Sequence, residues 1–358
     1  MNRISRRSFL RTSIYAGGIA LSLKLTSGIQ SAIAQTASNP STAWMQNNIG
    51  LLGSRTLRQI CMPGTHDAGM STIASGTLFS DSCNTQTQTS GILGQLQAGS
   101  RYFDIRPVIS GGQYLTGHYS DIGSGSTNSW QGGNGQSIQS IISDINTFTA
   151  DNEELIILNL SADLDTDLGN GSYAPFTQDQ WNALLSMMQQ GIGNLFVSSA
   201  SGSLDLTTLS LDSYIGNGNA AVVVIVSPSG SGISLGSFAN QGFYPATSFP
   251  SYNVYSDTNT LNQMISDQLS KMQAQRTNPN SVFFVLSWTL TQDSVQAAAC
   301  PLTGGSSTSI LDLANTADAQ LSQILPACNS QCYPNVIYID NIQSSLNVAA
   351  LAMQINEL

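Results

Sequence analysis

The segment SIQSIISDINTFTADNEELIILNL, residues 137–160, contains a pattern that recurs along the chain. In its first half, apolar residues return at steps of three and four, which predicts an amphipathic helix over Ser137–Thr149. In its second half, the continuous apolar run Leu155–Leu160 is typical of a strand buried on both faces. A helix followed by such a strand indicates a βα protein with a parallel sheet.

The same alternation extends in both directions from this segment. Further strand-like runs are Gln59–Met62, Tyr102–Ile105, Leu195–Val197, Ala221–Val226, Val282–Leu286 and Val336–Ile339. Further helical periods are Ile92–Ala98, Asp179–Gln190, Thr260–Gln275, Ile310–Ile324 and Leu346–Ile355. About seven strands alternating with helices predict a single α/β domain, a (β/α) barrel of the TIM type, over residues 35–358. A doubly wound open sheet is the alternative, but no G-x-G-x-x-G loop follows a strand to support it.

The first 34 residues have the features of an export signal. A twin-arginine motif, S-R-R-S-F-L, contains Arg6 and Arg7, and an apolar stretch follows from Ile14 to Leu25. Ala32-Ile33-Ala34 then fits a cleavage site of small residues. A membrane anchor is the alternative, but the stretch is shorter than the roughly 20 residues that span a bilayer and is interrupted by glycine. We therefore expect export by the twin-arginine pathway to the periplasm or the outside.

The charge of the remaining chain narrows its partners. After removal of residues 1–34, six basic and 21 acidic residues remain, for a net charge of −15. This charge argues against binding to nucleic acid and against docking on anionic lipid through a basic patch. No other apolar run approaches membrane-spanning length, and we expect a soluble monomer.

Five cysteines leave one unpaired if disulfides form, as export permits. Cys61 lies in an apolar run and is predicted to be a buried thiol. A bridge among the late cysteines Cys300, Cys328 and Cys332 is expected, while the pairing, including that of Cys83, is left open. A metal site is disfavoured because no histidine is near and no C-x-x-C occurs.

The chain has only two histidines, and both are placed after predicted strands. His66 lies in CMPGTHDAG, residues 61–69, just past the first strand, and His118 is predicted in the loop after the second strand. The carboxyl ends of barrel strands meet at one end, so both imidazoles are expected there. Histidine both accepts and donates protons near neutral pH, and a pair can act on the two sides of a phosphodiester. An ordinary surface or core role is the alternative for each.

Charged residues at two other strand ends add to this pair. Asp104 and Arg106 are two residues apart and share one face of a strand. They form either a structural ion pair or a phosphate-binding arginine with its orienting carboxylate. Asp340 follows the strand Val336–Ile339, where a carboxylate can fix the tautomer of a histidine.

Together these segments resemble the X-domain of phosphatidylinositol-specific phospholipases C, including the bacterial enzymes. The resemblance is carried by PGTHDAG (63–69), RYFDIR (101–106), His118, LIILNLS (155–161) and NVIYID (335–340), and it is strongest in residues 42–165. It implies a distorted (β/α) barrel that cleaves a phosphodiester by internal attack, giving diacylglycerol and a cyclic phosphate. The implied partners are a phospholipid, phosphatidylinositol or a related lipid, and transiently a membrane surface.

The resemblance also implies a role for each matching residue. His66 resembles the general base, supported by Asp340. His118 resembles the general acid, assisted by Asp67. Arg106 resembles the group that neutralises the phosphate, with Asp104 beside it.

No metal or other cofactor is expected. Calcium-dependent members of the family place an acidic ligand where Arg106 stands, and a guanidinium repels a cation. The alternative is calcium bound by Asp67 and Asp104 with Asp163 or Asp165.

The head group is less determined than the reaction. Bacterial relatives that bind inositol use basic residues after the middle strands, whereas this chain has serine at Ser161 and Ser227. The expected substrate-binding residues are Ser161, Asp163, Tyr252, Tyr255 and Trp288, although ordinary packing is an equal alternative for the aromatic ones. Three further functions stay open: a phosphodiesterase for another hydroxyl-bearing head group, a carbohydrate- or lipid-binding barrel, and a cofactor-loaded oxidoreductase, for which no cofactor motif is found.

Overall fold

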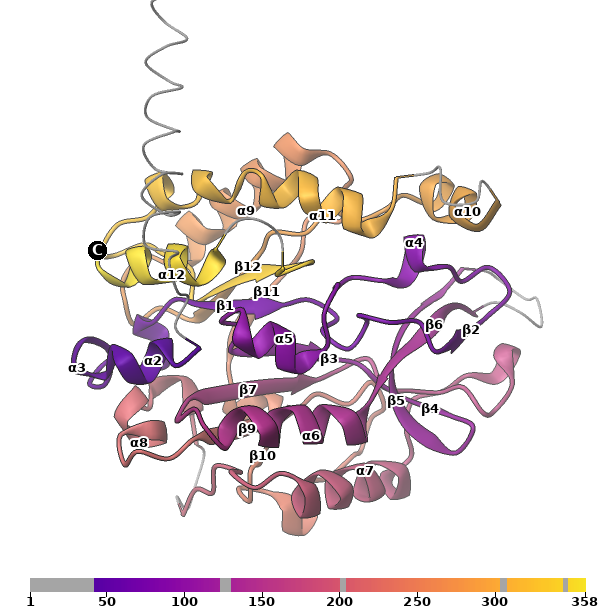
Figure 1. The fold of residues 1–358 in the computed structure, drawn as a ribbon, viewed down its shortest axis with the longest axis horizontal. Helices are drawn as coiled ribbons and strands as arrows, with labels where there is room; N and C mark the ends of the chain where they lie inside the picture. The colour runs from indigo at the N-terminus through magenta and orange to yellow at the C-terminus, as the bar shows by residue number, and fades with distance from the viewer. Residues whose placement is uncertain (1–41, 123–129, 200–203, 303–307, 344–346) are drawn as a thin grey trace, which may run out of the picture.

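The computed structural model of the chain describes residues 42–122, 130–199, 204–302, 308–343 and 347–358. The predicted export signal, residues 1–34, lies outside these residues. Eight parallel strands form one curled sheet in the order β10-β9-β7-β3-β1-β13-β12-β11 (Figure 1). Their bounds are β1 Met62–Thr65, β3 Tyr102–Ile105, β7 Leu155–Leu160, β9 Ala221–Val226, β10 Phe243–Pro245, β11 Ser251–Asn253, β12 Phe283–Ser287 and β13 Val336–Ile339.

The strand order confirms the predicted barrel over the doubly wound sheet. Each strand except β11 neighbours its predecessor in the sheet along the chain, and the last strand, β13, pairs with the first, β1. A doubly wound sheet would instead reverse its order at a switch point. The barrel is open along a seam, because its edge strands are β10 and β11 and only residues 246–250 connect them.

Helices cover the outer face of the sheet (Figure 1). One group packs outside β3, β7 and β9, and consists of α5 Ile92–Gln97, α6 Ile138–Thr149 and α7 Gln178–Gly191. Another packs outside β12 and β13, and consists of α9 Leu261–Gln275, α11 Ile310–Asp318 and α12 Val348–Asn356. No helix in the described part of the chain is both long and apolar enough to span a membrane.

Alternation along the strands fills the barrel with apolar side chains at one end only. In β7, Ile156 and Leu158 pack against the outer helices, whereas Leu155 and Ile157 pack in a second cluster with residues of the other strands. The next position of the inward set is Asn159, which lines a cleft. The barrel interior therefore changes from apolar to polar toward the carboxyl ends of its strands.

The first strand lies three residues later than predicted, and it includes a proline and a glycine. Pro63 lacks an N–H, but the ladder with β3 begins only at Gly64, so β3 does not require that donor. A Cβ on Gly64 would lie 2.5 Å from Cγ1 of Val336, so glycine permits the close pairing with β13. The predicted strand Leu195–Val197 is also wrong, since it makes only isolated bridges.

A second sheet extends from the barrel mouth and was not foreseen. Its order is β2-β6-β5-β4-β8, with bounds β2 Ser75–Gly76, β4 Pro107–Ser110, β5 Gln113–Asp121, β6 Trp130–Ser137 and β8 Leu164–Asp165. His118 is in β5, opposite Gly133 of β6, so its predicted place in a loop is wrong. The stretch is polar and glycine-rich, and it therefore lacks the apolar runs by which the barrel strands are recognised.

One disulfide joins two segments that are distant in sequence. Cys83 in α4, Ser82–Thr85, is bonded to Cys300 in α10, Ser294–Leu302. Cys328 and Cys332 are free thiols, so the expected bridge among the late cysteines is wrong. Cys300 belongs to a helix that packs on α4, whereas the other two cysteines pack near the predicted buried thiol Cys61. Cys61 is indeed buried and free.

Candidate active site

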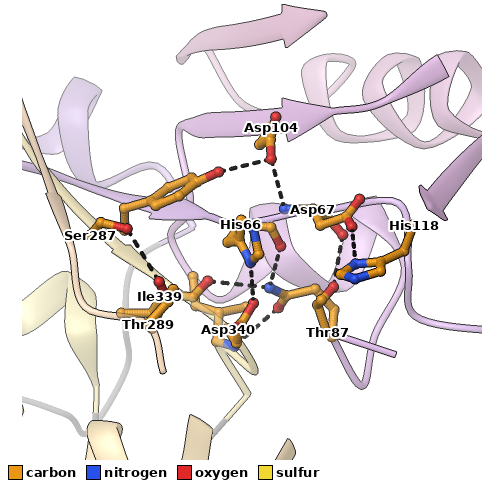
Figure 2. A network of polar contacts seen from close by, with 12 residues as sticks. His66, Asp67, Thr87, Asp104, His118, Ser287, Thr289, Ile339 and Asp340 are labelled. Atoms are coloured by element: carbon orange, nitrogen blue, oxygen red, sulfur yellow. Dashed lines mark hydrogen bonds and ion pairs between the residues drawn. The ribbon is translucent and has the colours of Figure 1, made fainter. Parts of the chain in front are cut away.

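Four barrel positions and one position of the second sheet meet at the polar end of the barrel. His66 follows β1, Asp104 is in β3, Arg106 follows β3, Asp340 follows β13, and His118 comes from β5. All five line a cleft of about 530 Å³. Figure 2 shows Asp340 beside His66 and Asp67 beside His118.

The turn after β1 brings the two sheets together. Asp67 has a left-handed backbone with φ 43°, and the amide of Ala68 donates to the carbonyl of Asp104 at 2.7 Å. Gly69 then lies against Thr116 of β5, where an added Cβ would be 2.2 Å from its hydroxyl oxygen. This close approach places His118, two residues further along β5, over Asp67.

His66 makes one hydrogen bond through each ring nitrogen. Its Nδ1 lies 2.8 Å from Oδ1 of Asp340, and its Nε2 lies 2.7 Å from a terminal nitrogen of Arg106. A guanidinium can only donate, so Nε2 accepts and carries no proton, while Nδ1–H donates to the carboxylate. This tautomer leaves a lone pair at the nitrogen that faces Arg106, as a general base requires.

Opposing effects set the pKa of His66. Burial acts to lower the pKa, and the nearby Arg106 acts in the same direction, but the carboxylates of Asp340 and Asp104 outweigh both. The net result is a pKa of His66 above its usual value. Asp340 therefore makes His66 a stronger base as well as fixing its tautomer.

Asp67 links the second imidazole to the guanidinium. Its Oδ2 lies 2.6 Å from Nδ1 of His118 and 3.3 Å from a terminal nitrogen of Arg106. The other oxygen, Oδ1, is buried without a hydrogen-bond partner, so the carboxylate depends on Arg106 and on its hydrogen bond with His118 for compensation. Nε2 of His118 makes no hydrogen bond within the described residues and belongs to a side chain that lines the cleft. This nitrogen is available to a ligand.

Asp104 holds Arg106 in place. Nε of Arg106 donates to Oδ2 of Asp104 at 3.0 Å, and Asp104 also accepts from the hydroxyls of Tyr338 at 2.9 Å and Ser161 at 3.0 Å. Burial acts to raise the pKa of Asp104, but Arg106, His66 and these hydroxyls bring it below its usual value. The pKa of Arg106 is raised, because Asp104 and Asp67 outweigh the effect of burial. The site thus holds a permanent ion pair, and the side chain of Arg106, which lines the cleft, is 24% exposed.

The six residues predicted to be catalytic therefore form one connected network, but the predicted substrate-binding set is only partly assembled. Ser161 and Tyr255 line the cleft. Trp288 does not, because its ring is buried in the outer layer and its Nε1 donates to the carbonyl of Ala317. Tyr252 stacks on Phe284 instead.

Asp163 is also outside the cleft. Its carboxylate is buried and accepts from the amides of Phe176 and Ser229, each at 2.6 Å, so it fixes two loops. Asp165 accepts from the side chain of Gln180. The ligand set of the calcium alternative is thus not brought together, and Arg106 already occupies the space between Asp67 and Asp104. No cluster of three potential metal-ligating side chains occurs among the described residues.

Sequence reasoning missed several neutral polar residues that line the cleft, namely Asn159, Asn253, Ser287, Thr289 and Tyr338. Most continue the inward-facing set of a strand beyond its apolar part. The signal that could have found them is the period of two, counted forward from the buried inward positions.

No protein-family model and no curated protein sequence matches the chain. Solved structures of phosphatidylinositol-specific phospholipase C from Staphylococcus aureus do match by fold. One of them, described as concerning the modulation of membrane binding of the Staphylococcus aureus protein, matches with a TM-score of 0.59 at 16% identity. The match covers 89% of this chain and 98% of the Staphylococcus aureus chain. A form containing pentafluorophenylalanine gives a TM-score of 0.60 at 15% identity, with the same coverage of both chains. The chain therefore shares the barrel fold of these bacterial proteins.

Proposed function

We propose that this protein is a metal-independent phosphodiesterase of the phosphatidylinositol-specific phospholipase C type. The observation that carries the proposal is that two imidazoles flank one guanidinium in a single hydrogen-bonded network at the mouth of a barrel. A binding protein does not require two histidines with separate carboxylate partners, whereas phosphodiester cleavage by internal attack requires a base and an acid. The shared fold is consistent with this function.

In the proposed first step, a substrate hydroxyl next to the phosphate gives its proton to Nε2 of His66 while its oxygen bonds to phosphorus. The Nδ1–H of His66 remains hydrogen-bonded to Asp340, which stabilises the imidazolium. Arg106 releases Nε2 of His66 and donates to the phosphate oxygens as charge develops on them. The contact of Arg106 with His66 is thus exchanged for a contact of Arg106 with the phosphate.

The bond from phosphorus to the glycerol oxygen breaks in the same step. That oxygen takes a proton from Nε2 of His118, whose Nδ1 is hydrogen-bonded to Asp67. Diacylglycerol and a cyclic phosphodiester leave, with His66 protonated and His118 neutral. Exchange with solvent, or hydrolysis of the cyclic ester with the two roles reversed, restores the starting protonation.

The surroundings of the cleft favour a lipid substrate. Phe79, Ile122 and Tyr255 line the cleft and are 45%, 66% and 56% exposed. Their exposed apolar neighbours in the same segments include Leu78 and Val254. An apolar mouth fits transient contact with a membrane surface, while exposed apolar groups in that number are unfavourable in water. We propose that the protein acts as a monomer.

The cleft lining also favours a neutral, hydroxyl-rich head group. Beyond the network, the described lining residues from the strand ends are amides and hydroxyls, including Asn159, Asn253 and Ser287. Arg106 and the two histidines are the only cationic or potentially cationic side chains among the described residues that line the cleft. Such a lining can hydrogen-bond a polyol such as inositol, but it offers no second anion site.

Export by the twin-arginine pathway is part of the proposal. The signal motif itself lies outside the described residues. The Cys83–Cys300 disulfide supports it, because such bonds persist mainly in oxidising compartments.

The test is incubation of the purified protein with phosphatidylinositol vesicles in EDTA, followed by phosphorus NMR. We expect a cyclic phosphate signal that is lost in His66→Ala and in His118→Ala, while Lys271→Ala, which removes a surface ion pair with Asp267, turns over normally. Turnover only with added calcium would favour the metal-dependent alternative. No turnover of any phosphodiester, or near-normal rates in a histidine variant, would contradict the proposal.

A further inference from the structure

The sheet ladder stops just before the two residues that form the His66–Asp340 pair. β1 and β13 pair in register up to Thr65 opposite Ile339, and one more bond joins the amide of His66 to the carbonyl of Ile339 at 3.0 Å. The turn after each strand then contains a residue with left-handed backbone, Asp67 with φ 43° after β1 and Asn341 with φ 47° after β13. The two turns that present the pair are therefore beyond the reach of regular sheet hydrogen bonding.

A short segment between α4 and α5 holds both turns. The side-chain nitrogen Nε2 of Gln88 donates to the main-chain carbonyls of His66 at 3.0 Å and Ile339 at 3.3 Å. The side-chain oxygen Oε1 accepts from the main-chain amide of Ile342 at 3.2 Å. One buried side chain thus contacts the main chain on both sides of the pair.

The neighbour of Gln88 repeats this arrangement. The hydroxyl of Thr87 donates to the carbonyl of Asp67 at 2.8 Å, and the carbonyl of Thr87 accepts from the amide of Asn341 at 2.8 Å. Figure 2 shows Thr87 between these turns, below Asp67. Gln88 differs from Thr87 in that it does not line the cleft, so it cannot act on a substrate directly.

We propose that Gln88 is a positioning residue that keeps the imidazole of His66 in register with the carboxylate of Asp340. The inference rests on the proposed function for its catalytic meaning. Its physical content is the fixed distance between two turns that come from opposite ends of the chain. A displacement of about 1 Å in such a pair can reduce turnover about 100-fold.

A matched control, Asn335, lies just before the start of β13, the strand that ends before Asp340. Asn335 is also a buried amide, whose nitrogen donates to the carbonyls of Leu57, Arg58 and Ile60. Its oxygen accepts from the amide of Phe284 at 2.9 Å. It ties several chain segments together as Gln88 does, but far from the imidazoles.

The experiment compares Gln88→Met with Asn335→Leu, each of which keeps the side-chain size and removes the hydrogen bonds. The chain has two histidines, so nitrogen-15 labelling of histidine gives two imidazoles to follow through a pH titration. His66 faces Asp340, Asp104, Arg106 and the ring of Tyr338. Loss of register with Asp340 should move the titration of His66 downward by about one pH unit in Gln88→Met. The signals of the His118 imidazole, whose Nδ1 partner is Asp67, serve as the internal reference.

Turnover of phosphatidylinositol vesicles gives the second readout. We expect kcat of Gln88→Met to fall about 10- to 100-fold with little change in KM. Asn335→Leu should unfold at a lower temperature but keep the His66 titration and kcat. If Gln88→Met does not fold, Gln88→Asn, one methylene shorter, should shift His66 in the same direction.

A wild-type His66 titration in a folded Gln88 variant would overturn the inference, as would an equal shift in Asn335→Leu. Absence of turnover in the wild-type protein would refute the proposed function instead. The titration would still decide whether Gln88 positions His66, so the two failures are distinguishable.

Discussion

Two arginines at the two ends of strand β3 have opposite environments. Arg101, just before the strand, is completely buried; it donates to Glu154 at 2.8 Å and to the carbonyls of Leu96, Ser100 and Thr42. Arg106, just after the strand, donates to Asp104, Asp67 and His66 and is partly open to the cleft. Burial lowers the pKa of Arg101 despite Glu154, whereas two carboxylates raise the pKa of Arg106.

The difference between the two arginines is whether one of the partners can be exchanged for a ligand. Every acceptor around Arg101 is a buried carboxylate or a main-chain carbonyl that cannot leave. Arg106 keeps two carboxylates as permanent partners, and it directs a third donor at Nε2 of His66, which a phosphate oxygen can replace. Arg101 therefore stabilises the fold, and Arg106 is available for binding.

The largest effect is expected at the start of β3, where Arg101 is completely buried. Arg101→Met should lower the free energy of unfolding by about 3–5 kcal/mol, because Glu154 would remain buried without its counter-charge. Urea unfolding followed by circular dichroism measures this loss. Protein that stays folded should retain normal kcat. A stability close to wild type would show that the two ends are not as different as described.

The second effect is expected after the end of β3, at Arg106, and it concerns activity. Arg106→Lys keeps the charge but loses the planar donors that reach Asp104, Asp67 and His66 together. We expect kcat/KM on phosphatidylinositol vesicles to fall about 100- to 1,000-fold, with a small change in unfolding temperature. A lysine variant with normal turnover would mean that charge alone suffices at this position.

The smallest effect sharpens the comparison through pH, since only the arginine after β3, Arg106, contacts an imidazole. Asp340→Asn removes a carboxylate that raises the pKa of His66. The acid limb of the kcat/KM profile should therefore move to lower pH, by about one unit. An unmoved limb would assign it to a group other than His66.

The same substitution has a defined effect on stability. A raised folded-state pKa of His66 stabilises the fold below the unfolded pKa of about 6.5, and this contribution is lost as pH rises through the folded pKa. The deficit of Asp340→Asn should thus be greatest in mildly acidic solution and shrink above neutrality. Unfolding in urea at several pH values measures this trend.

Much of the barrel could be predicted from the sequence because its strands are buried on both faces. The runs 102–105, 155–160, 221–226 and 336–339 match β3, β7, β9 and β13 at both ends. β1 was misplaced because proline and glycine normally mark a break, whereas here Pro63 precedes the β3 ladder and Gly64 permits close pairing with β13. The second sheet was missed because its two longest strands, β5 and β6, contain no continuous apolar run.

The charged part of the site was predictable for a related reason, since charge at the end of an apolar strand requires a partner or a function. Trp288 was assigned wrongly because a strand end gives direction only if the inward parity is counted, and its ring points to the outer layer. Gln88 has no such signal. A neutral residue in a polar stretch gains its meaning only from the two turns that it contacts.

The seam between β10 and β11 has a practical consequence for redesign. The network residues of the barrel lie at the ends of β1, β3 and β13, in the middle of the strand order, and His118 comes from the second sheet, whereas the seam is formed by the two outermost strands. Ala246 and Thr247 in the connection are exposed. New chain ends or an inserted module at this point would interrupt no strand that carries a residue of the hydrogen-bonded network.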